Sequence, residues 1–93
     1  MIGRKRVHVV VYGRVQGVFF RDFTRKEAER LCLKGWVRNC CDGTVEAVIE
    51  GNADNVAEML HWLHHGPPAA RVDEVVIRQE QPVGSEVSFV VRY

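Results

Sequence analysis

The pattern of hydrophobic and polar positions divides the chain into strands and helices. Residues 6–12 are rich in valine and are followed by Gly13, which is typical of a buried strand. From residue 20 to residue 34, hydrophobic residues recur near helical spacing and charged residues fill the gaps, and we expect Gly35 to end this helix. Residues 53–65 predict a second helix, because their hydrophobic residues follow the i, i+3, i+4, i+7 spacing of a face packed on a core.

A β-hairpin is predicted between the two helices. Residues 36–40 and 44–50 favour strands, and the Asp42-Gly43 pair between them is a common hairpin turn. In the second arm, alternation predicts that one set of side chains faces the core and the other set faces solvent. The predicted core-facing residues are Val45, Ala47 and Ile49, and the predicted solvent-facing residues are Glu46, Val48 and Glu50.

Two more strands are predicted near the C-terminus, at residues 71–79 and 87–93. The element order is therefore β-α-β-β-α-β followed by a short final strand. This order indicates an α+β, ferredoxin-like split β-α-β fold, in which an antiparallel sheet carries both helices on one face. The chain contains no linker, repeat or low-complexity tract, and we expect residues 1–93 to form a single domain.

Composition and charge narrow the classes of function. The 13 Lys and Arg residues nearly balance the 12 Asp and Glu residues, and the resulting net charge of +1 does not favour a nucleic-acid partner. The three cysteines do not form the even, spaced framework of a secreted disulfide protein, so we expect reduced thiols and a cytoplasmic protein. No segment resembles a membrane span or a signal peptide, so we expect no membrane partner.

The stretch from Gly13 to Arg21 is the strongest candidate for a functional site. Its sequence is Gly13-Arg14-Val15-Gln16-Gly17-Val18-Phe19-Phe20-Arg21, and it leads from a predicted strand into a predicted helix. Glycines permit positive φ, so consecutive backbone N–H groups can converge on an anion at a helix N-terminus, and the Arg21 guanidinium can bind phosphate oxygens. From spacing alone, a glycine turn followed by a solvated arginine is an equally good interpretation.

The same nine residues resemble the phosphate-binding signature of the acylphosphatases. The family's other signature is similar to a second stretch, Gly35-Trp36-Val37-Arg38-Asn39-Cys40-Cys41-Asp42-Gly43-Thr44-Val45-Glu46, and the likeness extends over nearly the whole chain. The resemblance implies a ferredoxin-like fold. It also implies an enzyme that hydrolyses acyl phosphates, which are carboxyl-phosphate mixed anhydrides, to carboxylate and phosphate.

The resemblance implies roles for individual residues as well. Arg21 and Asn39 are the implied catalytic residues, since Arg21 binds the phosphate and Asn39 positions the attacking water. The implied phosphate-binding residues are Gly13, Arg14, Val15, Gln16, Gly17, Val18, Phe19 and Arg21. Neither a metal nor another cofactor is expected. The expected partners are a small-molecule acyl phosphate and inorganic phosphate, which is both product and competitive inhibitor, and the expected state is a monomer.

The main alternative is an RNA-binding or ligand-binding ferredoxin-like module without catalysis, because one fold hosts many functions. In RNA-recognition modules, aromatic residues on the central strands stack on bases. The predicted strand at 44–50 has no aromatic residue, and Glu46 and Glu50 on its expected solvent face would repel a nucleic-acid backbone. The pattern therefore favours the hydrolase.

The histidines, cysteines and most aromatic residues have structural interpretations. His61, His64 and His65 favour a solvated helix end over a zinc site, because no H-E-x-x-H pattern is present. Cys32 is expected on the core face of the first helix, and Cys40 and Cys41 are expected to fill space rather than to catalyse. The aromatic residues expected to pack in the core are Phe19, Phe20, Phe23, Trp36 and Trp62.

Overall fold

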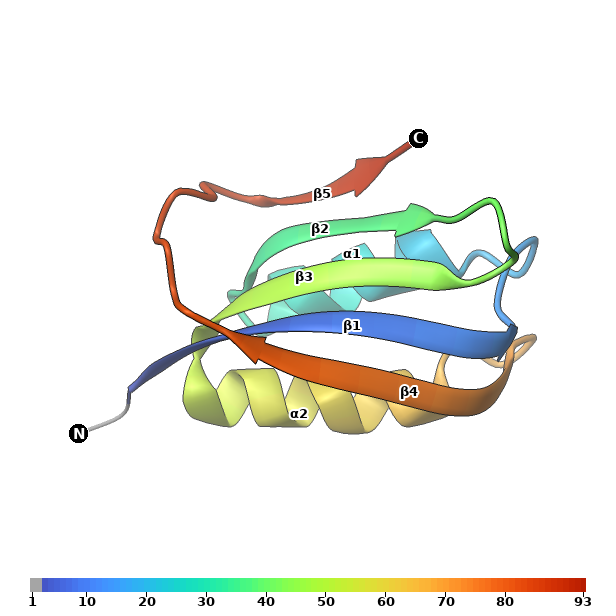
Figure 1. The fold of residues 1–93 in the computed structure, drawn as a ribbon, viewed down its shortest axis with the longest axis horizontal. Coiled ribbons are helices and arrows are strands. Elements are labelled where there is room, and N and C mark those ends of the chain that lie inside the picture. Colours follow the sequence, from blue (N-terminus) through green and yellow to red (C-terminus); the bar gives the residue numbers. More distant parts are fainter. Residues whose placement is uncertain (1–2) are drawn as a thin grey trace.

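The computed structural model describes residues 3–93, which form two helices packed on one face of a five-stranded sheet (Figure 1). In chain order the elements are β1 (Arg4–Arg14), α1 (Phe20–Arg30), β2 (Lys34–Asn39), β3 (Val45–Asn52), α2 (Ala53–His65), β4 (Arg71–Glu80) and β5 (Phe89–Arg92). The strand order in the sheet is β4-β1-β3-β2-β5. The ferredoxin-like α+β prediction is confirmed. Within residues 3–93, neither helix is long and apolar enough to cross a membrane.

The sheet is mixed, because β5 joins it in parallel with β2. The other three neighbouring pairs, β4 with β1, β1 with β3 and β3 with β2, are antiparallel. After β4 the chain crosses one end of the sheet and returns along the opposite edge (Figure 1). The prediction of an antiparallel sheet is therefore right for β1 to β4 and wrong for β5, which pairs in parallel. Local sequence patterns do not indicate the direction of this pairing.

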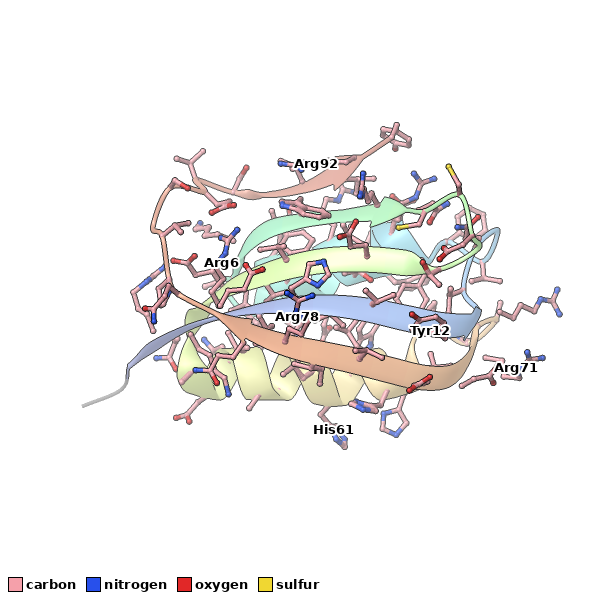
Figure 2. The ribbon with its side chains drawn as sticks, viewed as in Figure 1. Arg6, Tyr12, His61, Arg71, Arg78 and Arg92 are labelled. Carbon is pink, nitrogen blue, oxygen red and sulfur yellow. The ribbon has the colours of Figure 1, made fainter. Side chains whose placement is uncertain are left out.

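The core lies between the sheet and the two helices. Alternate valines of β1 point toward the helices, and α1 and α2 each turn one apolar stripe toward the sheet. The buried apolar residues of this core include Val7, Val9, Val11, Phe20, Leu33, Val37, Ile49, Val56, Met59 and Leu63. The opposite face of the sheet carries polar side chains such as Arg6 and Arg78 (Figure 2). Of the predicted packing aromatics, Phe20 and Trp62 pack together, whereas Phe19 and Phe23 are exposed.

The first helix ends four residues before the predicted position. Helix α1 ends at Arg30, and Cys32 takes a left-handed conformation with φ 57°. The backbone N–H of Leu33 donates to the carbonyl of Ala28, and that of Cys32 donates to Glu29, which together form a Schellman ending. The left-handed turn leaves Cys32 exposed and brings Leu33 into the core, so the predictions that Cys32 packs in the core and that Gly35 ends the helix are wrong.

Gly35 instead lies within β2, where it has φ 137°. A Cβ atom at this position would lie 1.9 Å from the carbonyl oxygen of Val48 on β3. The glycine is therefore required because two strand backbones approach each other closely.

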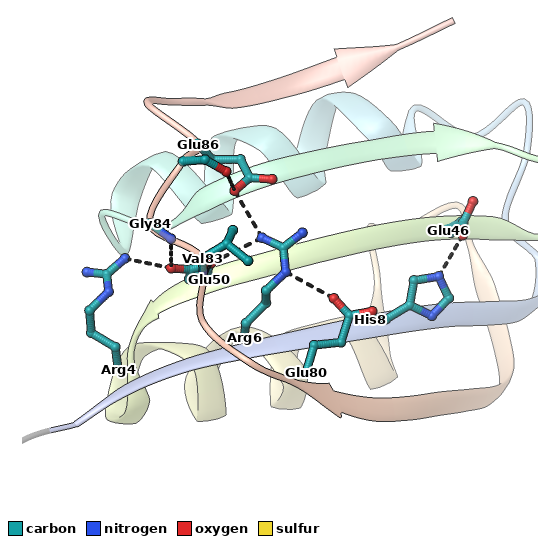
Figure 3. Close-up of polar contacts among 10 residues, drawn as sticks. Arg4, Arg6, His8, Glu46, Glu50, Glu80, Val83, Gly84 and Glu86 are labelled. Carbon is teal, nitrogen blue, oxygen red and sulfur yellow. Dashed lines mark hydrogen bonds and ion pairs between the residues drawn. The ribbon is translucent and has the colours of Figure 1, made fainter.

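Glu50 on β3 is buried, although it was predicted to face solvent. Alternation predicts a solvent-facing side chain, and Glu50 does point away from the helices, but only 1% of its surface is exposed. The segment that follows β4 covers it and donates backbone hydrogen bonds from Val83 and Gly84 to its carboxylate (Figure 3). Val48, also predicted to face solvent, is buried as well.

Substituting Gly35 should therefore destabilise the protein far more than substituting a glycine in a turn. We expect Gly35→Ala to lower the free energy of unfolding by at least about 3 kcal/mol, because the new methyl group overlaps backbone atoms that cannot rotate away. Gly43→Ala is the matched control, since Gly43 has φ 90° but nothing within 4 Å of the added Cβ. It should cost only about 1–2 kcal/mol of backbone strain. Urea unfolding curves of the two variants that superimpose would contradict this assignment.

Candidate active site

A pocket of about 430 Å³ lies where the β1–α1 loop meets the end of β2 and the last strand. The loop and the β2–β3 turn lie side by side at the same end of the sheet (Figure 1). The pocket is lined by Val15, Gly17, Phe19, Phe20, Arg21, Asp22, Asn39, Val91 and Tyr93. Residues from the two stretches singled out in the sequence thus line one cavity, together with Asp22 of α1, Val91 of β5 and the following Tyr93.

The β1–α1 loop, residues 15–19, offers backbone donors to the pocket. Gly17 has φ 74° and Phe19 has φ 61°, so the chain turns through two left-handed residues before the helix begins. Within residues 3–93, no side chain caps the N-terminus of α1, and none of the N–H groups of the loop donates to a protein acceptor. Unpaired N–H groups at a helix N-terminus form an anion-binding site, and the helix dipole adds to the attraction.

The predicted phosphate-binding residues do not all line the pocket. Val15, Gly17, Phe19 and Arg21 do, and Val18 is a buried residue of the same loop. Gly13 and Arg14 lie within β1, opposite β4. Gly13 sits at a bulge where an added Cβ would lie 2.1 Å from the carbonyl oxygen of Arg71, so its need for glycine comes from strand packing.

Gln16 connects the loop to the turn between β2 and β3. Its side-chain amide donates to the carbonyl oxygens of Cys40, at 2.8 Å, and Thr44, at 2.9 Å. These two carbonyls flank the turn that begins immediately after Asn39. Gln16 therefore fixes the distance between the loop and the end of β2, and this role requires no contact with a ligand.

Arg21 lies in the first turn of α1 and is half-buried. Its Nη1 donates to the backbone carbonyl of Arg92 at 3.3 Å, and its guanidinium carbon lies 4.7 Å from the centre of the Tyr93 ring. Among the described residues, no Asp or Glu side chain forms an ion pair with it. Its charge therefore remains available to an anion in the pocket. The sequence did not predict the contact between Arg21 and β5, because the hydrophobic pattern of a four-residue edge strand does not indicate which strand it pairs with.

Asn39 is the last residue of β2, where it pairs with Val45 of β3. It is half-buried and lines the pocket together with Arg21. Its side-chain amide has no hydrogen-bond partner within residues 3–93, and the residue lines the cavity. An unpaired amide at this place can hold a water molecule.

The cysteines next to Asn39 do not line the pocket. Cys40 is half-buried, and its Sγ lies 3.8 Å from Oε1 of Glu46. Cys41 is exposed in the turn. The prediction that they fill space is therefore wrong for Cys41 and only partly right for Cys40.

The pocket lining contains no histidine, and Asp22 is its only residue with a carboxylate side chain. Within residues 3–93, no group of three or more His, Cys, Asp or Glu side chains is arranged to hold a metal ion. The histidines at the end of α2 are exposed, and the rings of His64 and His65 hydrogen-bond to carbonyls one turn earlier in the same helix. What the pocket offers is a set of backbone donors, a guanidinium and an amide.

Comparison with known proteins decides the family. The family model for acylphosphatases matches residues 7–91. The chain belongs to the acylphosphatase family. Among its relatives, the acylphosphatase of Rubrobacter xylanophilus is 58% identical over 95% of this chain and 80% of its own length, and that of Thermococcus kodakarensis is 53% identical over 95% and 97%. The solved structure of a Coxiella burnetii acylphosphatase superimposes with a TM-score of 0.90 at 44% identity, covering 96% of this chain and 93% of that one.

Family membership identifies the chain as a hydrolase and favours catalysis over the alternative of a binding module. The prediction that Glu46 and Glu50 would repel a nucleic-acid backbone from the solvent face of β3 is wrong. Glu50 is covered, and Glu46 is paired with His8 and Arg38, so neither is a free negative charge on the open sheet face. The case for an acylphosphatase therefore depends on the family and the pocket, and not on repulsion by these two carboxylates.

The Gln16 bridge can be tested through stability. We expect Gln16→Met, which keeps the length of the side chain, to lower the free energy of unfolding by about 1–3 kcal/mol, because two hydrogen bonds of about 0.5–1.5 kcal/mol each are lost. Thermal and urea unfolding measure the change. Gln79→Met is a suitable control, since Gln79 is exposed on β4 and makes no side-chain hydrogen bond in the described part of the chain. Equal stability of the Gln16 and Gln79 variants would show that the bridge contributes nothing.

Proposed function

We propose that this chain hydrolyses acyl phosphates to carboxylate and phosphate, with the phosphoryl group bound by the β1–α1 loop and Arg21 and the attacking water held by Asn39. The observation that carries the proposal is the convergence, on one pocket, of unpaired N–H groups, a guanidinium without a carboxylate partner, and an unpaired amide. The membership of the chain in the acylphosphatase family supports the same reaction.

The loop and Arg21 match the charge that develops on the phosphoryl group. In phosphoryl transfer the transition state spreads negative charge over the equatorial oxygens, and fixed donors aimed at those oxygens stabilise it. The N–H groups of residues 15–19 need no reorganisation, because the fold already holds them without partners. Arg21 adds a full positive charge and a planar set of donors that can bind two oxygens at once. Inorganic phosphate, the product, fits the same donors and competes with substrate.

The leaving group explains why so few residues suffice. An acyl phosphate releases a carboxylate, whose conjugate acid has a pKa near ~4, so it departs without being protonated. No general acid is required. The absence of a histidine from the pocket lining is consistent with this reaction.

The attacking water requires orientation more than activation. An asparagine amide can hold a water through its oxygen and its NH₂ group, but it cannot accept the water's proton at neutral pH. We therefore propose that the proton passes to a phosphate oxygen of the substrate. Asp22 is exposed in the first turn of α1 and has the only carboxylate side chain in the pocket lining. Replacing it therefore tests whether the proton passes to an enzyme group and not to the substrate.

Substitutions of Arg21 and Asn39 should impair different steps, phosphate binding and the chemical step respectively. We expect Arg21→Ala to weaken binding of inorganic phosphate by roughly 10- to 150-fold and to abolish most turnover, because a charge-assisted contact of about 1.5–3 kcal/mol serves both the bound state and the transition state. Asn39→Ala should lower kcat by about 100-fold or more while phosphate affinity stays within about twofold, since the water matters only to the chemical step. Phosphate titrations and steady-state kinetics on acetyl phosphate separate the two effects.

The Lys variant of Arg21 serves as the charge control. Lys keeps one positive charge but cannot make a planar, two-point contact, so Arg21→Lys should recover only a small part of the lost affinity. An Asn39 variant with near wild-type kcat would refute the water-holding role.

Selectivity for the leaving group tests the reaction itself. Purified protein should hydrolyse acetyl phosphate well above its spontaneous rate and leave a simple alkyl phosphate untouched, even at equal occupancy of the site. An alkyl ester expels an alkoxide, and an acid that would protonate it contributes typically 10²–10⁴-fold. Occupancy is set by competition with inorganic phosphate, and Asp22→Asn is measured beside the wild type. Comparable hydrolysis of both substrates, or loss of acetyl phosphate turnover in Asp22→Asn, would reveal a general acid or base that the mechanism excludes.

A further inference from the structure

Glu50 is a buried carboxylate at the opposite end of the sheet from the pocket, and no step of the proposed reaction uses it. It holds the connecting segment, which we define as residues 81–88 between β4 and β5. The backbone N–H groups of Val83 and Gly84 donate to its two oxygens at 3.2 and 2.9 Å (Figure 3). A side chain only 1% exposed and bound to two consecutive N–H groups is a fixed attachment point for that segment.

Two arginines balance the charge of Glu50. Arg4 lies 3.2 Å and Arg6 lies 3.1 Å from its oxygens, and Arg6 also contacts Glu86 of the connecting segment at 2.9 Å. Burial by itself raises the pKa of Glu50, but the N–H groups of Val83 and Gly84 and the two guanidiniums outweigh it and lower the pKa to about 2. The attachment is therefore charged, and fully formed, throughout the neutral range.

Little else fixes the connecting segment. Every residue of the segment except Glu86 is exposed. The exposed residues include the apolar Val83 and Val87. Within the described residues, the segment makes one further hydrogen bond to the sheet besides its contacts to Glu50 and Arg6. In it, the Gly35 N–H donates to the carbonyl of Ser88. Because hydrophobic burial does not hold the segment, its position depends on the polar contacts around Glu50.

The connecting segment leads directly into the residues that contact Arg21. Strand β5 has only four residues, and its last one, Arg92, provides the carbonyl that accepts from Arg21. The Arg92 guanidinium stacks 4.4 Å from the ring centre of Trp36 on β2, and Tyr93 places its ring against Arg21. A shift of β5 along β2 would therefore move the carbonyl and the ring that orient the phosphate-binding guanidinium.

We propose that Glu50 is a positioning residue for Arg21, acting through the connecting segment and β5. This inference rests on the proposed function, in which Arg21 binds phosphate. Glu50→Gln preserves the shape of the side chain but replaces one acceptor oxygen with a donor. That donor must face a backbone N–H or a guanidinium in either orientation of the amide, so the attachment loosens.

The test is a double-mutant cycle on the affinity for inorganic phosphate, measured on folded proteins at neutral pH. Glu50→Gln should weaken phosphate binding about 5-fold or more in the wild-type background, and should have no further effect in the Arg21→Ala background. Glu80→Gln is the matched control, because the Glu80 side chain shares Arg6 with Glu50 but, among the described residues, forms no hydrogen bond or ion pair with the connecting segment. Its phosphate affinity should stay within about twofold of the wild type.

Each outcome of the cycle has a separate meaning. Wild-type phosphate affinity in folded Glu50→Gln, or an equal loss in both backgrounds, overturns the positioning role. Wild-type affinity in Arg21→Ala overturns the proposed phosphate site instead, and with it the basis of this inference. If Glu50→Gln does not fold, Glu86→Gln decides, since it removes the negative charge from the contact between Arg6 and the segment and leaves Glu50 in place. It should weaken phosphate binding about twofold to threefold in the wild-type background alone, and an unchanged affinity overturns the proposal.

Discussion

In the proposed reaction the backbone N–H groups of residues 15–19 bind a phosphate, which requires that no protein group already accepts from them. Within residues 3–93 the fold leaves these N–H groups without protein partners. β1 is a central strand whose pairing with β3 ends at Val11 and whose pairing with β4 ends at Arg14. α1 begins at Phe20, and no side chain of the described residues caps it. The donors between these two points belong to neither element. Leaving them unpaired is tolerable because Val15, Gly17 and Phe19 of this loop line a pocket, where water or an anion can accept from N–H groups.

The backbone of Phe19 is strained by the path of this loop. Phe19 is the residue before α1, it is left-handed with φ 61°, and 73% of the residue's surface is exposed. An aromatic residue with positive φ is rare, and such strain of about 1–3 kcal/mol concentrates at functional sites. The left-handed turn at Phe19 follows that at Gly17, and the two together shape the path of the five backbone N–H groups. The prediction that Phe19 packs in the core fails because the turn, and not burial, determines where its ring points.

The sequence predicted what local periodicity and motif resemblance can encode. The order of strands and helices followed from hydrophobic spacing, and Arg21 and Asn39 followed from the two signature stretches and line one pocket. The failures need tertiary information. A left-handed Cys32 took the place of the expected glycine at the end of α1, while Gly35 serves a close approach to Val48. Alternation could not show that a later segment covers Glu50, nor that β5 pairs in parallel.

Arg6 and Arg21 differ in the groups that surround them, and this difference gives Arg6 a structural role and leaves the charge of Arg21 available. Arg6 contacts Glu50, Glu80 and Glu86, and although its burial opposes the charge, these carboxylates raise the pKa of its guanidinium. Its charge and donors are committed to holding the fold. Arg21 is oriented by a carbonyl and an aromatic ring, neither of which carries a formal charge. A carboxylate in their place would have oriented Arg21 equally well, but it would also have competed with every phosphate that entered the pocket.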